Sequence, residues 1–211
     1  MEARRSGGGA GRRPLVLAVL LSGGGRTLEN LLRAIDRGDL DATVAVVVSS
    51  RPGVRGLEIA GAAGIPTATV ARGGHPSDVA FSDAVYAAVA PHEPDLLILA
   101  GFLRRLVVPP QWAGRILNIH PALLPESEAA GKGFHGERVH AAVLASGATR
   151  SGATVHIVDD GYDTGPVVLR ATVPVLPGDT PDTLAARVFA AECTLYPEAI
   201  AEWRREMRDK I

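Results

Sequence analysis

Residues 15–37 read LVLAVLLSGGGRTLENLLRAIDR, and this stretch decides the fold. It opens with a short apolar run, residues 15–21, which predicts a buried strand. The glycine-rich loop SGGGRT follows, and residues 27–37 then carry apolar side chains at the spacing of an amphipathic helix. A strand, a glycine loop and a helix in this order are typical of a doubly wound α/β sheet.

The same alternation of apolar runs and Ala-rich amphipathic segments continues along the chain. Further strands are expected at residues 42–49, 67–70, 95–100 and 116–120, and helices at 56–63, 78–89 and 137–145, with a turn or short helix at 111–115. This order predicts α/β architecture, a single mostly parallel sheet with right-handed crossovers. Two strands at 153–158 and 167–175, joined by the turn DDGYDTG, predict a β-hairpin-like addition, and residues 183–207 predict a long C-terminal helix.

The composition excludes several classes of protein. Of 211 residues, 46% are hydrophobic and the formal net charge is -1, so neither disorder along the whole chain nor a polyanion-binding protein is expected. The single cysteine, Cys193, excludes a disulfide framework and a multi-cysteine metal site within one chain. No apolar run reaches the roughly 18 to 20 residues that span a bilayer. We therefore expect a cytoplasmic protein with no nucleic-acid or membrane partner.

The first 13 residues differ from the rest. They are rich in Gly and Arg and show no hydrophobic periodicity or secretory signal, so residues 1–13 are predicted to be a disordered tail and 14–211 one catalytic domain. A basic arm that touches RNA or a membrane is the alternative.

The glycine loop is suited to an anion. Between a strand and a helix, glycines let the backbone approach a phosphate, and the helix N-terminus offers free N–H groups. The loop lacks the Lys of a P-loop, and Leu28 stands where a dinucleotide-binding loop has its third Gly. A tight strand-to-helix turn without a ligand is the alternative.

Asn118 and His120 lie on the same side of one predicted strand, because side chains alternate along a strand. Side by side, an amide and an imidazole can stabilise an oxyanion. A carboxylate of the following DDGYDTG turn could orient and charge His120, but spacing alone does not select Asp163. A solvated loop is the alternative, and it is expected for Asp159 and Asp160. His156 is expected in the core or in support of the site.

Other chemistries have little support. His135 and His140 have no acid-rich pair at zinc-binding spacing, so no metal is expected. A serine hydrolase would need a G-x-S-x-G turn, which is absent. His75 and His92 are expected at the surface.

Five segments in order resemble the folate-dependent formyltransferases, from about Pro14 to Trp203. They read LLSGGGRTLENLL, LAGFLRRL, LNIHPALLP, GATVHIVDDGYDTGPVV and AARVFAAECTLYP. The resemblance implies transfer of a formyl group from 10-formyltetrahydrofolate, as co-substrate, to the amine of glycinamide ribonucleotide in purine synthesis. Transfer to another amine, such as an amino sugar, and a non-catalytic folate-binding module are the alternatives. A monomer and a homodimer both stay open.

The resemblance also implies roles for residues at matching positions. Asn118, His120 and Asp163 match the catalytic residues, and His156 matches a supporting residue near them. Positions matching phosphate contacts are Gly25, Arg26 and Thr27, and those matching other acceptor contacts are Pro121, Gly133 and Glu192. Positions matching the folate pocket are Leu103, Arg104, Leu106, Asp159, Gly161 and Asp163. The family's polar pair after the last loop glycine is replaced here by Arg26 and Thr27, and the segment ESEAAGKGFHG is longer than usual.

Overall fold

The computed structural model describes residues 13–125 and 136–208. The predicted tail therefore lies outside the described residues except for Arg13, whose guanidinium makes a two-pronged ion pair with Asp95 at 2.6 and 2.7 Å. Gly133 and His135 also lie outside them. Within the described part, no helix is both long and apolar enough to cross a membrane.

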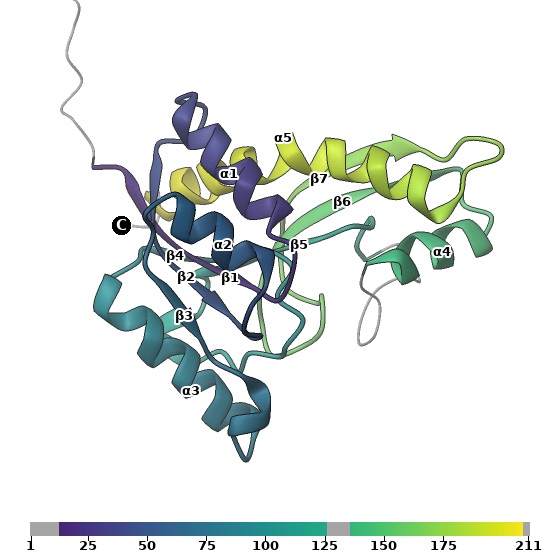
Figure 1. The fold of residues 1–211 in the computed structure, drawn as a ribbon. Helices are drawn as coiled ribbons and strands as arrows, with labels where there is room; N and C mark the ends of the chain where they lie inside the picture. The colour runs from purple at the N-terminus through teal and green to yellow at the C-terminus, as the bar shows by residue number, and fades with distance from the viewer. Residues whose placement is uncertain (1–12, 126–135, 209–211) are drawn as a thin grey trace, which may run out of the picture.

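One seven-stranded sheet in the order β3-β2-β1-β4-β5-β6-β7 organises the described chain (Figure 1). The strands are β1 (Leu15–Leu21), β2 (Ala42–Ser49), β3 (Thr67–Thr69), β4 (Leu96–Leu99), β5 (Ile116–His120), β6 (Arg150–Ile157) and β7 (Val167–Pro174). The helices are α1 (Arg26–Asp36), α2 (Arg55–Ala62), α3 (Asp78–Val89), α4 (Glu137–Ala145) and α5 (Pro181–Arg208). The first five strands are parallel, whereas β6 is antiparallel to both β5 and β7. The predicted mostly parallel sheet, the hairpin-like addition and the long helix are confirmed.

Alternation along β1 explains the two layers of core. Leu17, Val19 and Leu21 pack on one face with α1, α2, α4 and α5, whereas Ala18 and Leu20 pack on the other with α3. Figure 1 shows α3 alone on its side of the sheet and α1, α2 and α5 on the opposite side. Because both faces are covered, the strand can be almost wholly apolar.

Several predicted boundaries differ from the structure. Asp95 precedes β4 instead of beginning it, and its carboxylate accepts bonds from Arg13 and the Val16 N–H. β6 begins at Arg150, three residues earlier than predicted, where it pairs with Pro174 of β7. The segment predicted at 111–115 is a 3₁₀ turn, Pro110–Trp112. Ser77 caps α3 as predicted, accepting a bond from the Ala80 N–H.

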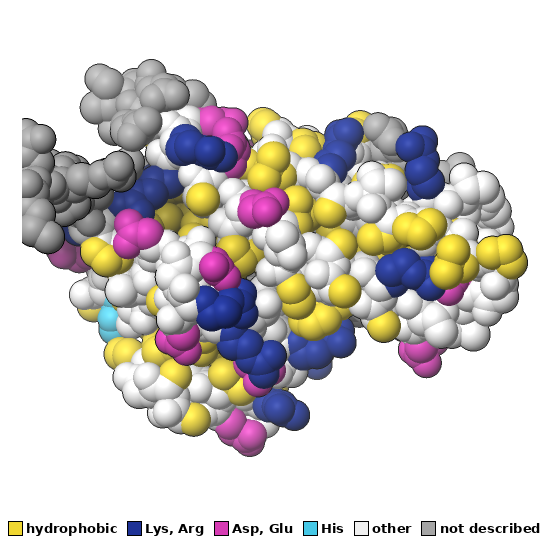
Figure 2. Space-filling model, turned by 90° about the horizontal axis from the view of Figure 1, so that it is seen from above, with side chains coloured by type: hydrophobic (Ala, Val, Ile, Leu, Met, Phe, Trp, Pro, Cys, Tyr) yellow, Lys and Arg dark blue, Asp and Glu magenta, His cyan; other side chains and the backbone are white. Residues whose placement is uncertain are grey.

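Charged side chains are mixed over the surface. On the face seen in Figure 2, arginine and acidic side chains lie among one another without a broad field of one sign. This mixture agrees with the formal net charge of -1.

Hydrogen bonds from one side chain join helix α5 to the sheet beneath the candidate site. The Tyr196 hydroxyl is fully buried and lies 3.0 Å from the Leu99 carbonyl and 2.9 Å from the Leu117 carbonyl. The next residue, Pro197, has no N–H to donate to the carbonyl of Cys193, which lies one turn earlier in the helix. The Asn30 side chain of α1 donates to that carbonyl at 2.8 Å and so joins the two helices.

Replacing Asn30 with Ala is therefore expected to lower the free energy of unfolding by about 1 kcal/mol, because the Cys193 carbonyl loses its donor. Urea denaturation monitored by circular dichroism measures the change. Asn30→Asp is the matched control, since a carboxylate of the same shape cannot donate and should destabilise at least as much. An Asn30→Ala variant as stable as the wild type would refute this role.

Candidate active site

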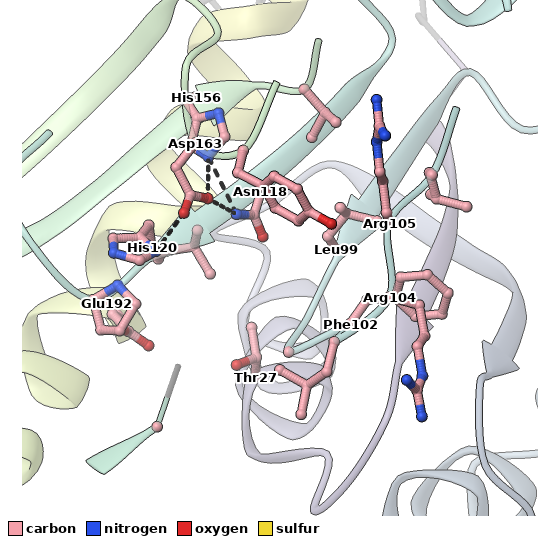
Figure 3. A pocket seen from close by; sticks show the side chains of 18 of the residues that line it. Thr27, Leu99, Phe102, Arg104, Arg105, Asn118, His120, His156, Asp163 and Glu192 are labelled. Carbon is pink, nitrogen blue, oxygen red and sulfur yellow. Dashed lines mark hydrogen bonds and ion pairs between the residues drawn. The ribbon is translucent and has the colours of Figure 1, made fainter. Parts of the chain in front are cut away.

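A cavity of about 780 Å³ opens at the carboxyl ends of the parallel strands. In an open α/β sheet this edge is where ligands bind. Its wall is formed by the start of α1, the segment after β4, the end of β5, the β6–β7 loop and α5. Figure 3 shows the labelled side chains of this wall.

Two polar side chains of β5 point into the cavity, as their alternation predicts. His120 is almost fully buried, and Asn118 is half-buried. Because β5 and β6 are antiparallel in this register, His156 lies directly opposite Asn118. This register places an imidazole next to the Asn118 amide.

Asp163 lies at the centre of this cluster (Figure 3). One of its carboxylate oxygens is 3.4 Å from His120 Nδ1, and the other is 3.4 Å from Asn118 Nδ2 and 3.5 Å from His156 Nε2. Its backbone has φ of 56°, in the left-handed region that few non-glycine residues adopt. The loop is held in this conformation and brings the carboxylate back over β5, an arrangement often found at functional sites.

His156 orients the amide of Asn118. Its Nδ1 is 3.0 Å from the Ile157 carbonyl, so this nitrogen carries the proton. Its Nε2 then accepts a bond from Asn118 Nδ2 at 3.1 Å. The amide nitrogen of Asn118 therefore faces His156 and Asp163, and the bond to Asp163 is long enough to yield to a ligand oxygen.

The loop that carries Asp163 is built by its own side chains. The Asp159 carboxylate accepts bonds from the Gly161 N–H at 3.0 Å and the Thr164 hydroxyl at 2.8 Å. The expectation that Asp159 is merely solvated was wrong, because its carboxylate closes the turn. The Asp160 side chain is exposed, while its carbonyl accepts a bond from Arg105.

The glycine loop makes the turn into α1. Gly25 has φ of 74°, and a Cβ there would lie 2.6 Å from the Gly56 Cα, so only glycine fits. Gly25 is not part of the cavity wall, whereas Arg26 and Thr27 are. The Arg26 guanidinium lies 4.3 Å from the centre of the Phe189 ring, a cation–π contact that aims it along α5.

The segment after β4 forms the opposite wall. Leu103 and Arg104 are exposed there and Leu106 is buried. The Leu103 N–H donates to the Ser22 hydroxyl at 2.9 Å, which ties this wall to the glycine loop. The segment and the Asp163 loop are also joined, because Arg105 donates to the Asp160 carbonyl at 3.0 Å.

Every predicted site residue within the described chain except Gly25 lies in the cavity wall. Those found there are Arg26, Thr27, Leu103, Arg104, Leu106, Asn118, His120, Pro121, His156, Asp159, Gly161, Asp163 and Glu192. Sequence reasoning missed Arg105, Tyr162, Phe189 and His140, which also line it. The doubled arginine of LAGFLRRL and the aromatic of DDGYDTG were signals for the first two. Among the described residues, no group of three or more His, Cys, Asp or Glu side chains could hold a metal.

Two further histidine expectations need correction. His75 is half-buried, with its ring edge-to-face on Phe81 at 5.9 Å between centres. His92 is also half-buried. Neither is among the residues of the cavity wall.

Comparison with known proteins identifies the family of this chain. The formyl transferase family matches residues 15–200. This chain belongs to the formyl transferase family. The match covers all three elements that carry the catalytic candidates, β5, β6 and the β6–β7 loop.

Relatives of this formyl transferase include proteins of similar length and a much longer one. The phosphoribosylglycinamide formyltransferase of Mycobacterium tuberculosis is 45% identical over 192 residues, covering 89% of this chain and 84% of the relative. That of Escherichia coli K12 is 36% identical over 92% of this chain and 89% of its own. The trifunctional purine biosynthetic protein adenosine-3 of Drosophila pseudoobscura is 40% identical over 88% of this chain, which spans only 13% of that relative.

Solved structures of the family have the same fold. The phosphoribosylglycinamide formyltransferase of Coxiella burnetii superimposes with a TM-score of 0.80 at 37% identity, covering 90% of this chain and 86% of that one. The enzyme of Brucella melitensis gives a TM-score of 0.79 at 41% identity, covering 89% and 94%.

Glu192 adds a titrating group to this family member's cavity. Burial raises the pKa of its carboxyl to about 7, although the Arg26 charge opposes the shift. Between its ordinary value of 4.5 and about 7, the unfolded chain releases this proton while the folded chain keeps it. Glu192 therefore lowers the stability of the folded state as pH rises through this interval.

A Glu192→Gln variant is expected to gain stability relative to the wild type as pH rises from about 4.5 to about 7, and to hold that gain above it. Urea denaturation of both proteins at about pH 5 and about pH 8 measures the difference. A stability difference that is the same at both pH values would contradict the expectation.

Proposed function

We propose that this formyl transferase moves the formyl group of 10-formyltetrahydrofolate to the amine of glycinamide ribonucleotide, in purine biosynthesis. The products are formylglycinamide ribonucleotide and tetrahydrofolate. The observation that carries the proposal is the cluster of Asn118, His120 and Asp163 on one wall of a cavity that extends from the start of α1 to the segment after β4. The similarity to phosphoribosylglycinamide formyltransferases supports this choice of acceptor.

The reaction makes one carbon–nitrogen bond and breaks another. The acceptor amine attacks the formyl carbon, and the carbonyl oxygen becomes an oxyanion in a tetrahedral intermediate. The bond from that carbon to the folate nitrogen N10 then breaks. The amine nitrogen loses one proton and N10 gains one, so no external acid or base is consumed.

Three residues supply the groups that this reaction needs. Protonated His120 donates a hydrogen bond to the oxyanion, and the N–H of Asn118 that is weakly held by Asp163 provides a second donor. Asp163 orients the His120 ring, balances its positive charge and helps to carry the proton from the amine to N10. His156 keeps the Asn118 amide in the donating orientation.

The cavity has two ends suited to two substrates. Arg26, Thr27 and Glu192 lie at the end near α1 and α5, where a nucleotide phosphate meets the helix N-terminus. Leu103, Arg104 and the loop carrying Asp163 lie at the other end, where the folate ring system fits. The cluster between them brings the amine and the formyl carbon together, which is a positioning effect. A cytoplasmic location and the monomeric or homodimeric state stay predictions.

Arg26→Ala is expected to raise KM for the nucleotide by about tenfold to a hundredfold, because a charged contact to phosphate is lost. KM for the folate should stay within about twofold of wild type. Steady-state kinetics with each substrate varied in turn measures both values. Arg33→Ala is the matched control, since Arg33 is exposed on the same helix and pairs with Glu29. Equal changes in both KM values would show that Arg26 does not bind the phosphate specifically.

An acceptor panel tests the proposed function. The purified protein is mixed with 10-formyltetrahydrofolate and, separately, with glycinamide ribonucleotide, an amino-sugar nucleotide or no acceptor, and the absorbance change of the folate is followed. Turnover that requires glycinamide ribonucleotide supports the proposal. If only the amino-sugar nucleotide supports turnover, it is the acceptor instead of glycinamide ribonucleotide. Folate binding without turnover would indicate a binding module.

A further inference from the structure

His140 is a buried histidine, and one of its ring nitrogens has no hydrogen-bond partner among the described residues. It lies in the first half of α4 and is 5% exposed. Its Nδ1 is buried and has no hydrogen-bond partner among the described residues. Because an unsatisfied buried polar atom costs free energy, it calls for a reason.

The position of His140 supplies that reason. Its side chain is part of the wall of the catalytic cavity, together with Gly136 and Glu137 at the start of the same helix. Helix α4 packs against α5, the helix that carries Glu192. His120 lies near enough for its charge to act on His140.

His140 therefore belongs to the nucleotide end of the cavity. Figure 3 shows His120 and Glu192 on one side of Asp163, with Phe102, Arg104 and Arg105 on the other. The segment after β4 therefore lies across Asp163 from His120 and Glu192. A ligand atom that reaches His140 comes from the acceptor, close to the point where its amine meets the formyl carbon.

We propose that His140 is a binding residue for the acceptor, with Nδ1 forming a hydrogen bond to the glycinamide end of the nucleotide. The inference rests on the proposed function and adds a contact that the resemblance did not assign. A glycinamide carries an amine, an amide N–H and a carbonyl, so it offers both donors and acceptors to an imidazole.

The charge state of His140 agrees with this role. Burial lowers the pKa of His140, and the neighbouring His120 lowers it further. A neutral imidazole has one donor and one acceptor nitrogen, whereas an imidazolium has two donors and would repel an ammonium group. The neutral ring therefore accommodates the uncharged amine that attacks the formyl carbon.

Ser151 provides a matched control within the same protein. Its hydroxyl is the other buried side-chain atom without a partner among the described residues. Ser151 lies in β6 and is not part of the cavity wall. Removal of either atom relieves a buried unsatisfied group, but only His140 can lose a ligand contact.

The test compares His140→Leu, His140→Asn and Ser151→Ala with the wild type in full kinetic analyses and in thermal unfolding. His140→Leu is expected to raise KM for glycinamide ribonucleotide about tenfold, with KM for the folate within about twofold. Its Tm should be no lower than that of the wild type, since an unsatisfied polar group is removed. His140→Asn, whose amide reaches the region of Nδ1, should recover part of the loss. Ser151→Ala should leave both KM values unchanged.

The outcomes separate the inference from the function on which it rests. If the wild-type protein turns over the nucleotide and His140→Leu has the same KM for it, the inference about His140 is overturned and the proposed function is not. A lowered Tm with equal losses for both substrates also overturns it, because that pattern describes a packing residue. No nucleotide-dependent turnover by the wild type overturns the proposed function, and the inference falls with it.

Discussion

Replacing Asp163 with asparagine is expected to lower kcat by about a thousandfold while both substrates still bind. The neutral amide cannot balance the charge of His120 or carry the proton between the two nitrogens. The change should leave the loop intact, because asparagine tolerates the left-handed backbone that Asp163 adopts at φ of 56°. The loss therefore reports chemistry rather than folding.

Stopped assays over long incubation measure the residual rate of Asp163→Asn, and calorimetry measures the two dissociation constants. Asp160→Asn is the matched control, since Asp160 is an exposed carboxylate in the same loop and its structural bond is made by its backbone carbonyl. A variant at Asp163 with kcat within fivefold of wild type would show that the carboxylate has no catalytic role.

Removal of the His120 imidazole is expected to cause the second large loss of kcat. His120→Ala is expected to lower kcat by about a hundredfold to ten-thousandfold, because the oxyanion loses its charged donor. The side chain is buried against the cavity, so its removal leaves a space next to Asp163. Added imidazole should enter that space and restore part of the rate.

The rescue of His120→Ala is measured as kcat against imidazole concentration. His92→Ala serves as control, since His92 is not a residue of the cavity wall and its loss should change neither the rate nor its response to imidazole. A His120→Ala enzyme of near wild-type activity would contradict the proposed mechanism. A large loss of kcat that imidazole does not restore would argue against His120 as a hydrogen-bond donor and favour a packing role.

Local patterns were sufficient for much of the fold. The limits of β2, α3, β5 and α4 agree with the sequence prediction residue for residue, because each has a clear periodicity and a clear stop. Strand alternation alone predicted that the side chains of Asn118 and His120 point to the same side of β5. The position of the site followed from the rule that ligands bind at the carboxyl ends of parallel strands.

Contacts between distant segments could not be predicted in the same way. Selecting Asp163 among three aspartates requires its left-handed backbone and the turn closed by the Asp159 side chain. The bond from His156 to Asn118 requires the antiparallel register of β5 and β6. The resemblance pointed to Asp163 and His156, but their physical roles depend on geometry that spacing does not contain.

The most direct test of the account follows the formyl group itself. The protein is incubated with 10-formyltetrahydrofolate labelled with ¹³C in the formyl carbon and with glycinamide ribonucleotide, and the products are examined by NMR and mass spectrometry. We expect the label in an amide of the nucleotide, formed at the rate at which the folate is consumed and abolished by Asp163→Asn. Label recovered as free formate, or left on the folate, would contradict formyl transfer to this amine.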